Sequence, residues 1–367
     1  MELAQKGSLN ALDQTDGNCF WKGWITDGVL PSADTIGRVH GLLDVDKLRS
    51  VLRHTYSRLK RNKALRPAFH DKLFAVIMDG HESSASYLRC CCGCLEREIK
   101  TATGTEIQYY HRHVTAVLLC EGFVLLLDLE MQRPGEDEVA AAIRLLERLF
   151  IAYPRAFDVV MADGLYARAP FFRKVVEHGK HVIAVLKDDR RDLLKDANGI
   201  FSQEQPIVVQ NGNVVRQCWD VEELASWPQF GNVRVVRSLE TKARRRQKTG
   251  KTETTVSDWM WVTTIPKEML GTEAFVVIAH KRWDIENKAF NELVTYWHAD
   301  HVYAHSRVAI EAFWLTTMLA YNLFHAFINR NLKPVVRLKY TKRFIASAIS
   351  AELCKLKIKP TAKSPPR

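Results

Sequence analysis

The sequence predicts an α/β fold in which a mixed β-sheet is covered by helices. Two apolar runs, Val159–Ala162 and His181–Leu186, show no polar alternation, which is typical of strands buried on both faces. A strongly amphipathic segment over Glu138–Tyr153 indicates a helix that covers such a sheet. The chain has 367 residues, 47% of them hydrophobic and 26% charged, so it is long enough for a large core.

The predicted elements of the core follow the order β-β-β-α-β-α-β. The first strand, Phe74–Met78, precedes a hairpin that turns at Glu121-Gly122. The first helix begins after Pro134-Gly135 with an acidic turn. The other elements are, in order, Glu106–Leu119, Phe123–Leu127, Glu138–Tyr153, Val159–Ala162, Pro170–His178 and His181–Leu186. This order matches the RNase H-like fold, in which an antiparallel meander precedes parallel strands joined by helices.

Residues 191–265 are predicted to form a β-rich insertion, because helical periodicity disappears over Lys187–Thr264. Asn211-Gly212-Asn213 is typical of a hairpin turn. A second pair of strands flanks a basic tip over Lys242–Lys251. This tip carries Arg244, Arg245 and Arg246. We expect it to contact phosphate groups, and a solvated loop is the alternative.

The remaining segments are predicted to be mainly helical. Residues 1–70 form an N-terminal region whose helical stripe over Val39–Leu59 leads into the basic run SRLKRNKALR, a solvated or DNA-facing surface. After Pro266, helices over Arg282–Trp297 and Ile310–Phe327 return to the core. The predicted core thus comprises residues 71–190 and 266–330, and residues 331–367 form a frayed basic tail.

The charge balance favours a polyanionic partner. Lysine and arginine number 53 against 42 aspartate and glutamate residues, a net charge of +11, which favours nucleic acid over a membrane surface. No apolar run reaches transmembrane length, because Glu121-Gly122 interrupts Val114–Leu129. The polar stretch Met1–Asp13 does not form a signal peptide. We therefore expect a cytoplasmic protein without membrane contact.

Three carboxylates occupy positions where α/β folds place chemistry. Asp79 and Asp163 each follow an apolar strand and precede a glycine, although Asp-Gly is also a common turn pair. On neighbouring strands they would lie ~5 Å apart, and Glu286 on the helix after the insertion completes the set. Carboxylate oxygens suit Mg²⁺ or Mn²⁺, and two such ions serve phosphodiester chemistry. Without a paired cation, we expect these carboxylates to repel one another until metal binds.

Over Asp71–Arg330 the sequence resembles the DDE transposases of bacterial insertion sequences, in the branch with a β-rich insertion between the second Asp and the Glu. The resemblance rests on VIMDG around Asp79, VVMADGLY around Asp163, and RWDIENKAFNEL, in which Arg282 precedes Glu286 by four positions. Each Asp-Gly match is weak alone. The three motifs are specific together because their spacing and strand order also fit.

Part of the family pattern is missing. The family has a tyrosine three residues before the arginine and a lysine seven residues after the glutamate, where this chain has Ala279 and Leu293. His280, Lys281 and Lys288 are the candidate substitutes as DNA contacts.

The resemblance implies metal-dependent DNA cleavage and strand transfer at the ends of an insertion sequence. Asp79, Asp163 and Glu286 would be the catalytic ligands of two Mg²⁺ or Mn²⁺ ions, and Arg282 would contact a phosphate. It also implies a homodimer on paired terminal inverted repeats, acting on target DNA at the bacterial nucleoid. Some members flip a base onto an aromatic side chain of the insertion. The candidates are Trp219, Trp227, Trp259 and Trp261, with strand packing as the alternative for each.

Two other functions stay open. One is a nuclease of the same fold that lacks strand transfer. The other is a decayed transposase that acts only as a DNA-binding protein. The complete set of three carboxylates argues against decay, whereas the short N-terminal region argues mildly for it.

Asp128 also ends an apolar strand. In the predicted topology the third strand lies two strands from the first, roughly 10 Å away. We therefore interpret Asp128 as a turn or capping residue rather than a metal ligand.

The chain has 8 cysteines, of which Cys90, Cys91, Cys92 and Cys94 crowd together, an arrangement unlike a disulfide framework. Two thiolates and two imidazoles could close a tetrahedral zinc site. The candidate set is Cys92, Cys94, His111 and His113. The spacing fits no standard zinc motif, and we favour the alternative of buried free thiols beside an ordinary strand.

Overall fold

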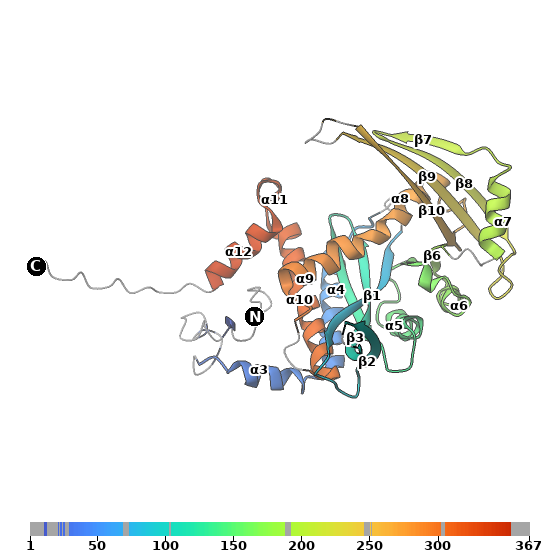
Figure 1. Cartoon of the computed structure of the whole chain (residues 1–367). Coiled ribbons are helices and arrows are strands. Elements are labelled where there is room, and N and C mark those ends of the chain that lie inside the picture. The colour runs from blue at the N-terminus through green and yellow to red at the C-terminus, as the bar shows by residue number, and fades with distance from the viewer. Residues whose placement is uncertain are drawn as a thin grey trace, which may run out of the picture. The chain divides into compact units, whose positions relative to one another are not determined.

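The computed structural model describes residues 11–12, 21, 23, 25, 29–68, 73–102, 104–187, 192–245, 250, 252–301 and 305–353 (Figure 1). The chain forms two compact units. The helical unit comprises residues 1–64, 82–112 and 291–367, and the sheet unit comprises residues 65–81 and 113–290. The division falls inside two long strands, β1 (Ala75–Ser86) and β3 (Gly104–Cys120).

The sheet unit is built on a mixed sheet in which β4 (Phe123–Met131), β3, β1, β5 (Val159–Ala162) and β6 (His181–Val185) are neighbours in this order, and the four strands described below continue the sheet beyond β6. β4 is antiparallel to β3, whereas β1, β5 and β6 run parallel. Every residue of β4 and β5 is buried. Burial on both faces explains why β5 shows no polar alternation, whereas β4 carries two charged residues, Asp128 and Glu130. The predicted mixed α/β class is confirmed. The RNase H-like assignment and the domain boundaries at residues 70, 190, 265 and 330 stay predictions.

Helices α5 (Glu138–Ala152) and α6 (Ala169–Glu177) follow the strands of this core. The Asp137 side chain caps α5 by accepting a hydrogen bond from the Ala140 N–H. Pro170 lies in the first turn of α6, where a missing N–H leaves no helical hydrogen bond unmade. Residues at helical spacing bury the inner face of α5, namely Val139, Ala142, Leu145, Leu146, Leu149 and Phe150.

The insertion extends the same sheet. Its strands are β7 (Ile207–Asn211), β8 (Val214–Leu224), β9 (Val233–Arg245) and β10 (Thr252–Thr263), paired antiparallel in sequence order. β10 also pairs antiparallel with β6, with Trp261 opposite Val185. Of the basic tip, Arg246 and the side chains of Arg244 and Arg245 lie outside the described residues.

The prediction that helical periodicity is absent from Lys187–Thr264 is wrong at its start. Helix α7 (Asp192–Phe201) lies there and buries Leu193, Ala197 and Phe201. These residues recur every fourth position, so the helical signal exists but spans fewer than three turns.

A further strand was not predicted. β2 (Leu95–Thr101) pairs antiparallel with the first half of β3, so four strands precede α5 instead of three. The sequence LEREIKT is mostly charged, and this strand is only partly buried, so it lacks the apolar run that marked the other strands. Gly104, with a positive φ of 145°, closes the turn between β2 and β3.

The helical unit is organised around α10 (Arg307–Asn331), which packs against α3 (Ala33–His40), α4 (Val45–Arg61) and α9 (Asn291–Trp297). The continuous stripe predicted over Val39–Leu59 is interrupted, because α3 ends at His40 and α4 begins after the capping residue Asp44. The side chain of Asp44 accepts hydrogen bonds from the backbone N–H groups of the next turn, which starts a new helix there. Among the described residues, no helix combines the length and the apolar character needed to cross a bilayer.

The tail predicted to fray contains two helices, α11 (Pro334–Lys339) and α12 (Lys342–Leu353). α12 buries Ile345 and Ala346, and Lys342 pairs with Glu292 at 3.2 Å, which gives this helix contacts within its unit. The end of the tail, including KSPPR, lies outside the described residues.

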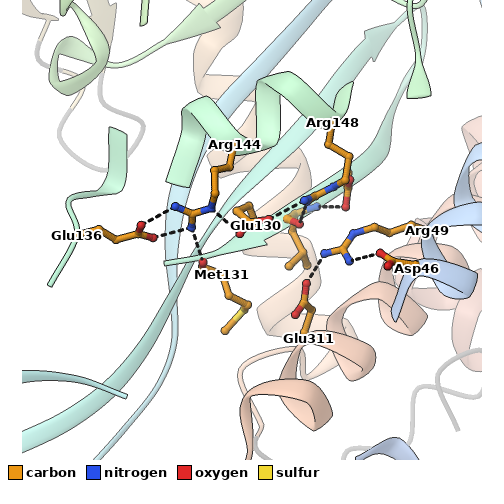
Figure 2. A network of polar contacts seen from close by, with 10 residues as sticks. Asp46, Arg49, Glu130, Met131, Glu136, Arg144, Arg148 and Glu311 are labelled. Carbon is orange, nitrogen blue, oxygen red and sulfur yellow. Dashed lines mark hydrogen bonds and ion pairs between the residues drawn. The ribbon is translucent and has the colours of Figure 1, made fainter. Parts of the chain in front are cut away.

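Buried ion pairs hold α5 to β4 in the sheet unit (Figure 2). Arg148 pairs with Asp128 at 2.6 Å and with Glu130 at 2.7 Å. Arg144 pairs with Glu130 at 3.0 Å and with Glu136 at 2.5 Å. Asp128 is 2% exposed and lies within β4, so its interpretation as a turn or capping residue is wrong. In the helical unit, Arg49 likewise pairs with Glu311 (Figure 2).

We predict that Arg148→Met lowers the free energy of unfolding by about 3–5 kcal/mol, because two buried carboxylates lose their shared cation. Urea unfolding of the purified protein measures this change. Arg66 provides the matched control, since it pairs with Glu121 at 3.8 Å on the exposed surface. Arg66→Met should cost less than about 1 kcal/mol. Equal costs for the two variants would contradict a special contribution from the buried pairs.

Candidate active site

Asp79 and Asp163 lie just beyond the paired stretch of two neighbouring parallel strands. Asp79 lies inside β1, which continues to Ser86, so the predicted end of the first strand at Met78 is wrong. Ala75 of β1 is opposite Val159 of β5 and Ile77 is opposite Met161, so the predicted adjacency of these strands is present in the structure. Asp163 follows β5 directly and begins a tight 3₁₀ turn. A side chain at the next position, Gly164, would lie 3.1 Å from the Val185 carbonyl oxygen, which explains why glycine is suited to it.

Glu286 lies on an irregular helical segment. Helix α8 (Thr272–His280) passes through a 3₁₀ turn at Lys281–Trp283 into a π-helical turn at Ile285–Phe290. The regular helix predicted from Arg282 is therefore wrong in its first half, because apolar spacing alone does not distinguish α from π winding. π-Helical turns are rare and concentrate at functional sites.

Arg282 joins the three carboxylates. Its guanidinium nitrogens lie 3.3 Å from Asp79 Oδ2, 3.5 Å from Glu286 Oε1 and 4.0 Å from Asp163 Oδ1. The Arg282 side chain is only 5% exposed. Lys187, two residues after β6, adds a second cation 3.6 Å from Asp163 Oδ1. The expectation that these carboxylates lack a paired cation is wrong, because the fold brings cations that are distant in sequence to the site.

A fourth carboxylate, Glu138, was not predicted as a site residue. It is the first residue of α5, is buried, and accepts a hydrogen bond from the Tyr166 hydroxyl at 2.5 Å. A side chain on Gly80 would overlap the Glu138 carboxylate, so the glycine after Asp79 allows close approach of the two segments. The sequence showed Glu138 only as part of an acidic helix start.

Burial and the neighbouring charges act together on Asp79. Burial raises the pKa of Asp79 to about 6, and the Glu138 and Glu286 carboxylates also raise it. The Arg282 guanidinium lowers this pKa, as does the Gly80 N–H, which donates to Asp79 Oδ1 at 2.9 Å. Burial thus outweighs the two groups that favour the charged form of Asp79, Arg282 and the Gly80 N–H.

The donor chemistry of these residues suits a divalent metal. Asp163 Oδ1 is buried and accepts no hydrogen bond from the described residues. Asp79, Glu286 and Glu138 place further carboxylates in the same region, and carboxylate oxygens are the ligands that Mg²⁺ and Mn²⁺ prefer. A cation could satisfy the Asp163 oxygen and offset the excess charge together.

Comparison with known proteins assigns the family. A family model described as the transposase DDE domain matches residues 75–323, more than half of the chain. The chain belongs to the transposase DDE domain family. No curated protein matched the sequence. The resemblance stated from the motifs is confirmed, and Asp79, Asp163 and Glu286 all lie inside the matched range.

The positions that depart from the transposase family pattern are buried in the structure. Ala279 is 2% exposed and Leu293 is fully buried, so neither position is available for a phosphate contact. Of the candidate substitutes, Lys288 pairs with Asp284 at 2.8 Å. His280 lies 2.7 Å from Glu240. Burial raises the pKa of the Glu240 carboxyl, but His280 and Arg216 outweigh burial and lower this pKa to about 2.

Tryptophans of this transposase-family chain differ in exposure. Trp227 and Trp261 are buried, whereas Trp219 and Trp259 are partly exposed. A further tryptophan, Trp283, was not predicted as a candidate. It is 38% exposed, lies next to Arg282 in sequence, and its ring centroid is 5.1 Å from the Arg282 guanidinium.

The predicted zinc set is only partly brought together. The structure groups Cys94 and His111 with Cys91 and His305, not with Cys92 and His113. Cys92 is exposed in its turn. His113 is two residues further along β3 than His111, ~7 Å away, and its ring lies beside that of His81. His305 was missed because it is distant in sequence from the cysteines.

We predict that Asp79 makes stability depend on pH in metal-free protein. Burial raises the folded pKa of Asp79 to about 6 from the ordinary value of 3.8, so the folded state keeps a proton that the unfolded chain releases. The free energy of unfolding should therefore fall between about pH 4 and pH 6, by about 3 kcal/mol at most, and stay level above that range. Chemical unfolding in EDTA across this range measures the effect.

Asp79→Asn should remove the pH dependence that Asp79 contributes. Glu138→Gln should lower the folded pKa of Asp79, because a like charge is lost, so the fall in stability should end at a lower pH. Identical pH dependence in the parent protein and in Asp79→Asn would contradict the raised pKa.

Proposed function

We propose that this chain is a DNA transposase that cleaves DNA at the ends of an insertion sequence and transfers the strand to target DNA. One observation carries the proposal. Asp79 on β1 and Asp163 directly after β5 follow the paired stretch of adjacent parallel strands, and Glu286 joins them around Arg282, in a chain of the transposase DDE domain family. The resemblance supports double-stranded DNA as the partner, a homodimer on paired inverted repeats, and action at the bacterial nucleoid.

Asp79, Asp163 and Glu286 would hold the divalent ions, two Mg²⁺ or Mn²⁺. Bound ions of this kind polarise the scissile phosphate as Lewis acids. The carboxylates hold their positions because Asp79 lies within β1, Asp163 directly follows β5, and Glu286 belongs to a helical segment with a buried face. Rigid elements position such groups more accurately than loops do.

Arg282 would offset the carboxylate charge and contact a DNA phosphate. Its planar guanidinium suits bidentate contact with a phosphate, and it is already within 4.0 Å of all three carboxylates. Glu138 would act as a positioning residue, because it packs against the Asp79-Gly80 backbone and the Tyr166 hydroxyl fixes its orientation. Lys281, Lys288 and the basic tip are the further DNA contacts in this proposal.

We predict that Asp163→Asn abolishes DNA cleavage while DNA binding is kept or improved. The substitution preserves shape but removes a charge that the metal needs, and it also reduces repulsion of the phosphate. Cleavage of a duplex carrying one element end, with a gel-shift assay in parallel, measures both properties. Asp79→Asn and Glu286→Gln should separate cleavage from binding in the same way.

Asp258→Asn is the matched control, because Asp258 forms an ion pair with Arg237 on an exposed part of the insertion. It should keep cleavage within a few-fold of the parent. Retained cleavage in Asp163→Asn would contradict the proposed site. Cleavage without joining of pre-cut ends to target DNA would favour a nuclease, and binding by a parent protein that never cleaves would favour a decayed transposase.

A prediction for the insertion concerns salt dependence. Replacing Arg244, Arg245 and Arg246 together by serine should weaken DNA binding and reduce the slope of log K against log salt by up to about 0.9 for each lost phosphate contact. A matched triple variant of Arg58, Lys60 and Arg61 changes the exposed last turn of α4 instead. An unchanged slope in the first variant would show that the tip faces solvent, and a reduced slope in the second would place the contact on α4.

A further inference from the structure

Four metal-ligand side chains meet in the helical unit, apart from the carboxylates described above. Cys91 and Cys94 lie in the turn between β1 and β2, His111 lies on β3, and His305 precedes α10. Their ligand atoms all lie within 4.8 Å of one another. Residues more than 200 positions apart thus converge on one point, which sequence spacing could not reveal.

The distances match a tetrahedral arrangement. The two sulfur atoms lie 3.7 Å apart, and His111 Nε2 lies 3.4 Å from Cys91 Sγ and 3.3 Å from Cys94 Sγ. His305 Nε2 lies 3.3 Å from Cys94 Sγ. A tetrahedral zinc ion with usual bond lengths would separate its sulfur ligands by ~3.8 Å and a sulfur from a nitrogen ligand by ~3.5 Å.

We propose that Cys91, Cys94, His111 and His305 bind one structural zinc ion. Two thiolates and two imidazoles fill the four positions of a closed site, which leaves no open position for a substrate. Two thiolates also balance the charge of the ion. This site is independent of the proposed DNA chemistry, because none of its ligands belongs to the set around Arg282.

The local backbone supports the two sulfur ligands. The Cys94 N–H donates to the Cys91 carbonyl oxygen at 3.0 Å, which closes the turn, and the Cys91 N–H donates to Cys94 Sγ at 3.2 Å. Such N–H donors stabilise a thiolate. Between the cysteines, a side chain on Gly93 would lie 3.2 Å from Arg307 Cβ, so the turn packs closely against the start of α10.

The burial of the ligands fits a structural site rather than a redox pair. Cys94 and His111 are buried, whereas reactive cysteines have accessible sulfur atoms. A buried thiol of this kind is expected to ionise when a metal ion binds.

The ion would link the start of α10 to the turn between β1 and β2. His305 immediately precedes Ser306, whose side chain caps α10 by accepting from the Ala309 N–H at 3.3 Å. A metal at His305 therefore connects the turn after β1 with the helix around which this unit is organised. Because the unfolded chain holds no preformed site, the binding free energy would add to folding stability.

The test is metal analysis of the full-length protein, purified under reducing conditions without chelators. We expect about one equivalent of zinc per chain and an X-ray absorption spectrum with two sulfur and two nitrogen ligands. After exchange with Co²⁺, a thiolate-to-cobalt charge-transfer band should appear. Cys94→Ser and His305→Gln should lower the zinc content more than tenfold, while Cys92→Ser, an exposed neighbour in the same turn, should keep it.

Several results would overturn the proposal. These are folded parent protein without zinc, an absorption spectrum with only oxygen and nitrogen ligands, equal zinc content in Cys92→Ser and Cys94→Ser, or a Cys91–Cys94 disulfide in the reduced preparation. If the ligand variants do not fold, the absorption spectrum of the parent protein decides alone.

Discussion

The buried guanidinium of Arg282 holds the candidate active site together. Carboxylates from β1, from the end of β5 and from the π-helical turn all lie within 4.0 Å of it. Burial raises the pKa of Asp79 to about 6 even though Arg282 lowers it, and the Glu138 and Glu286 carboxylates add to the rise. The fold therefore maintains a charge arrangement that favours further cations, which is a common sign of a functional site.

The irregular winding between α8 and α9 is also related to the burial of Arg282. Arg282 must stay buried while Ile285, Ala289 and Phe290 are also buried. The 3₁₀ turn and the π-helical turn together change the winding between these positions. Such irregular winding is costly in isolation and persists where the surrounding structure stabilises it.

Much of the core could be predicted from the sequence, because strands buried on both faces produce continuous apolar runs and α5 has a clear helical period. The pairing of Asp79 and Asp163 followed from strand order alone. Charged side chains were harder to place. Asp128 looked like a strand-end residue, and only the structure shows Arg148 beside it. Glu138, Lys187 and His305 reach their sites through tertiary contacts between distant segments, and no local pattern marks them.

The antiparallel pairing of β10 with β6 means that the insertion also completes the sheet of the core. β6 is the last parallel strand of the core, so without β10 its outer backbone groups would form a bare sheet edge. The insertion is therefore not a detachable appendage. β10 covers the outer edge of β6, and β6 is the neighbour of β5, the strand that Asp163 follows. Removal of the insertion would therefore expose an unpaired, aggregation-prone strand edge close to the candidate active site.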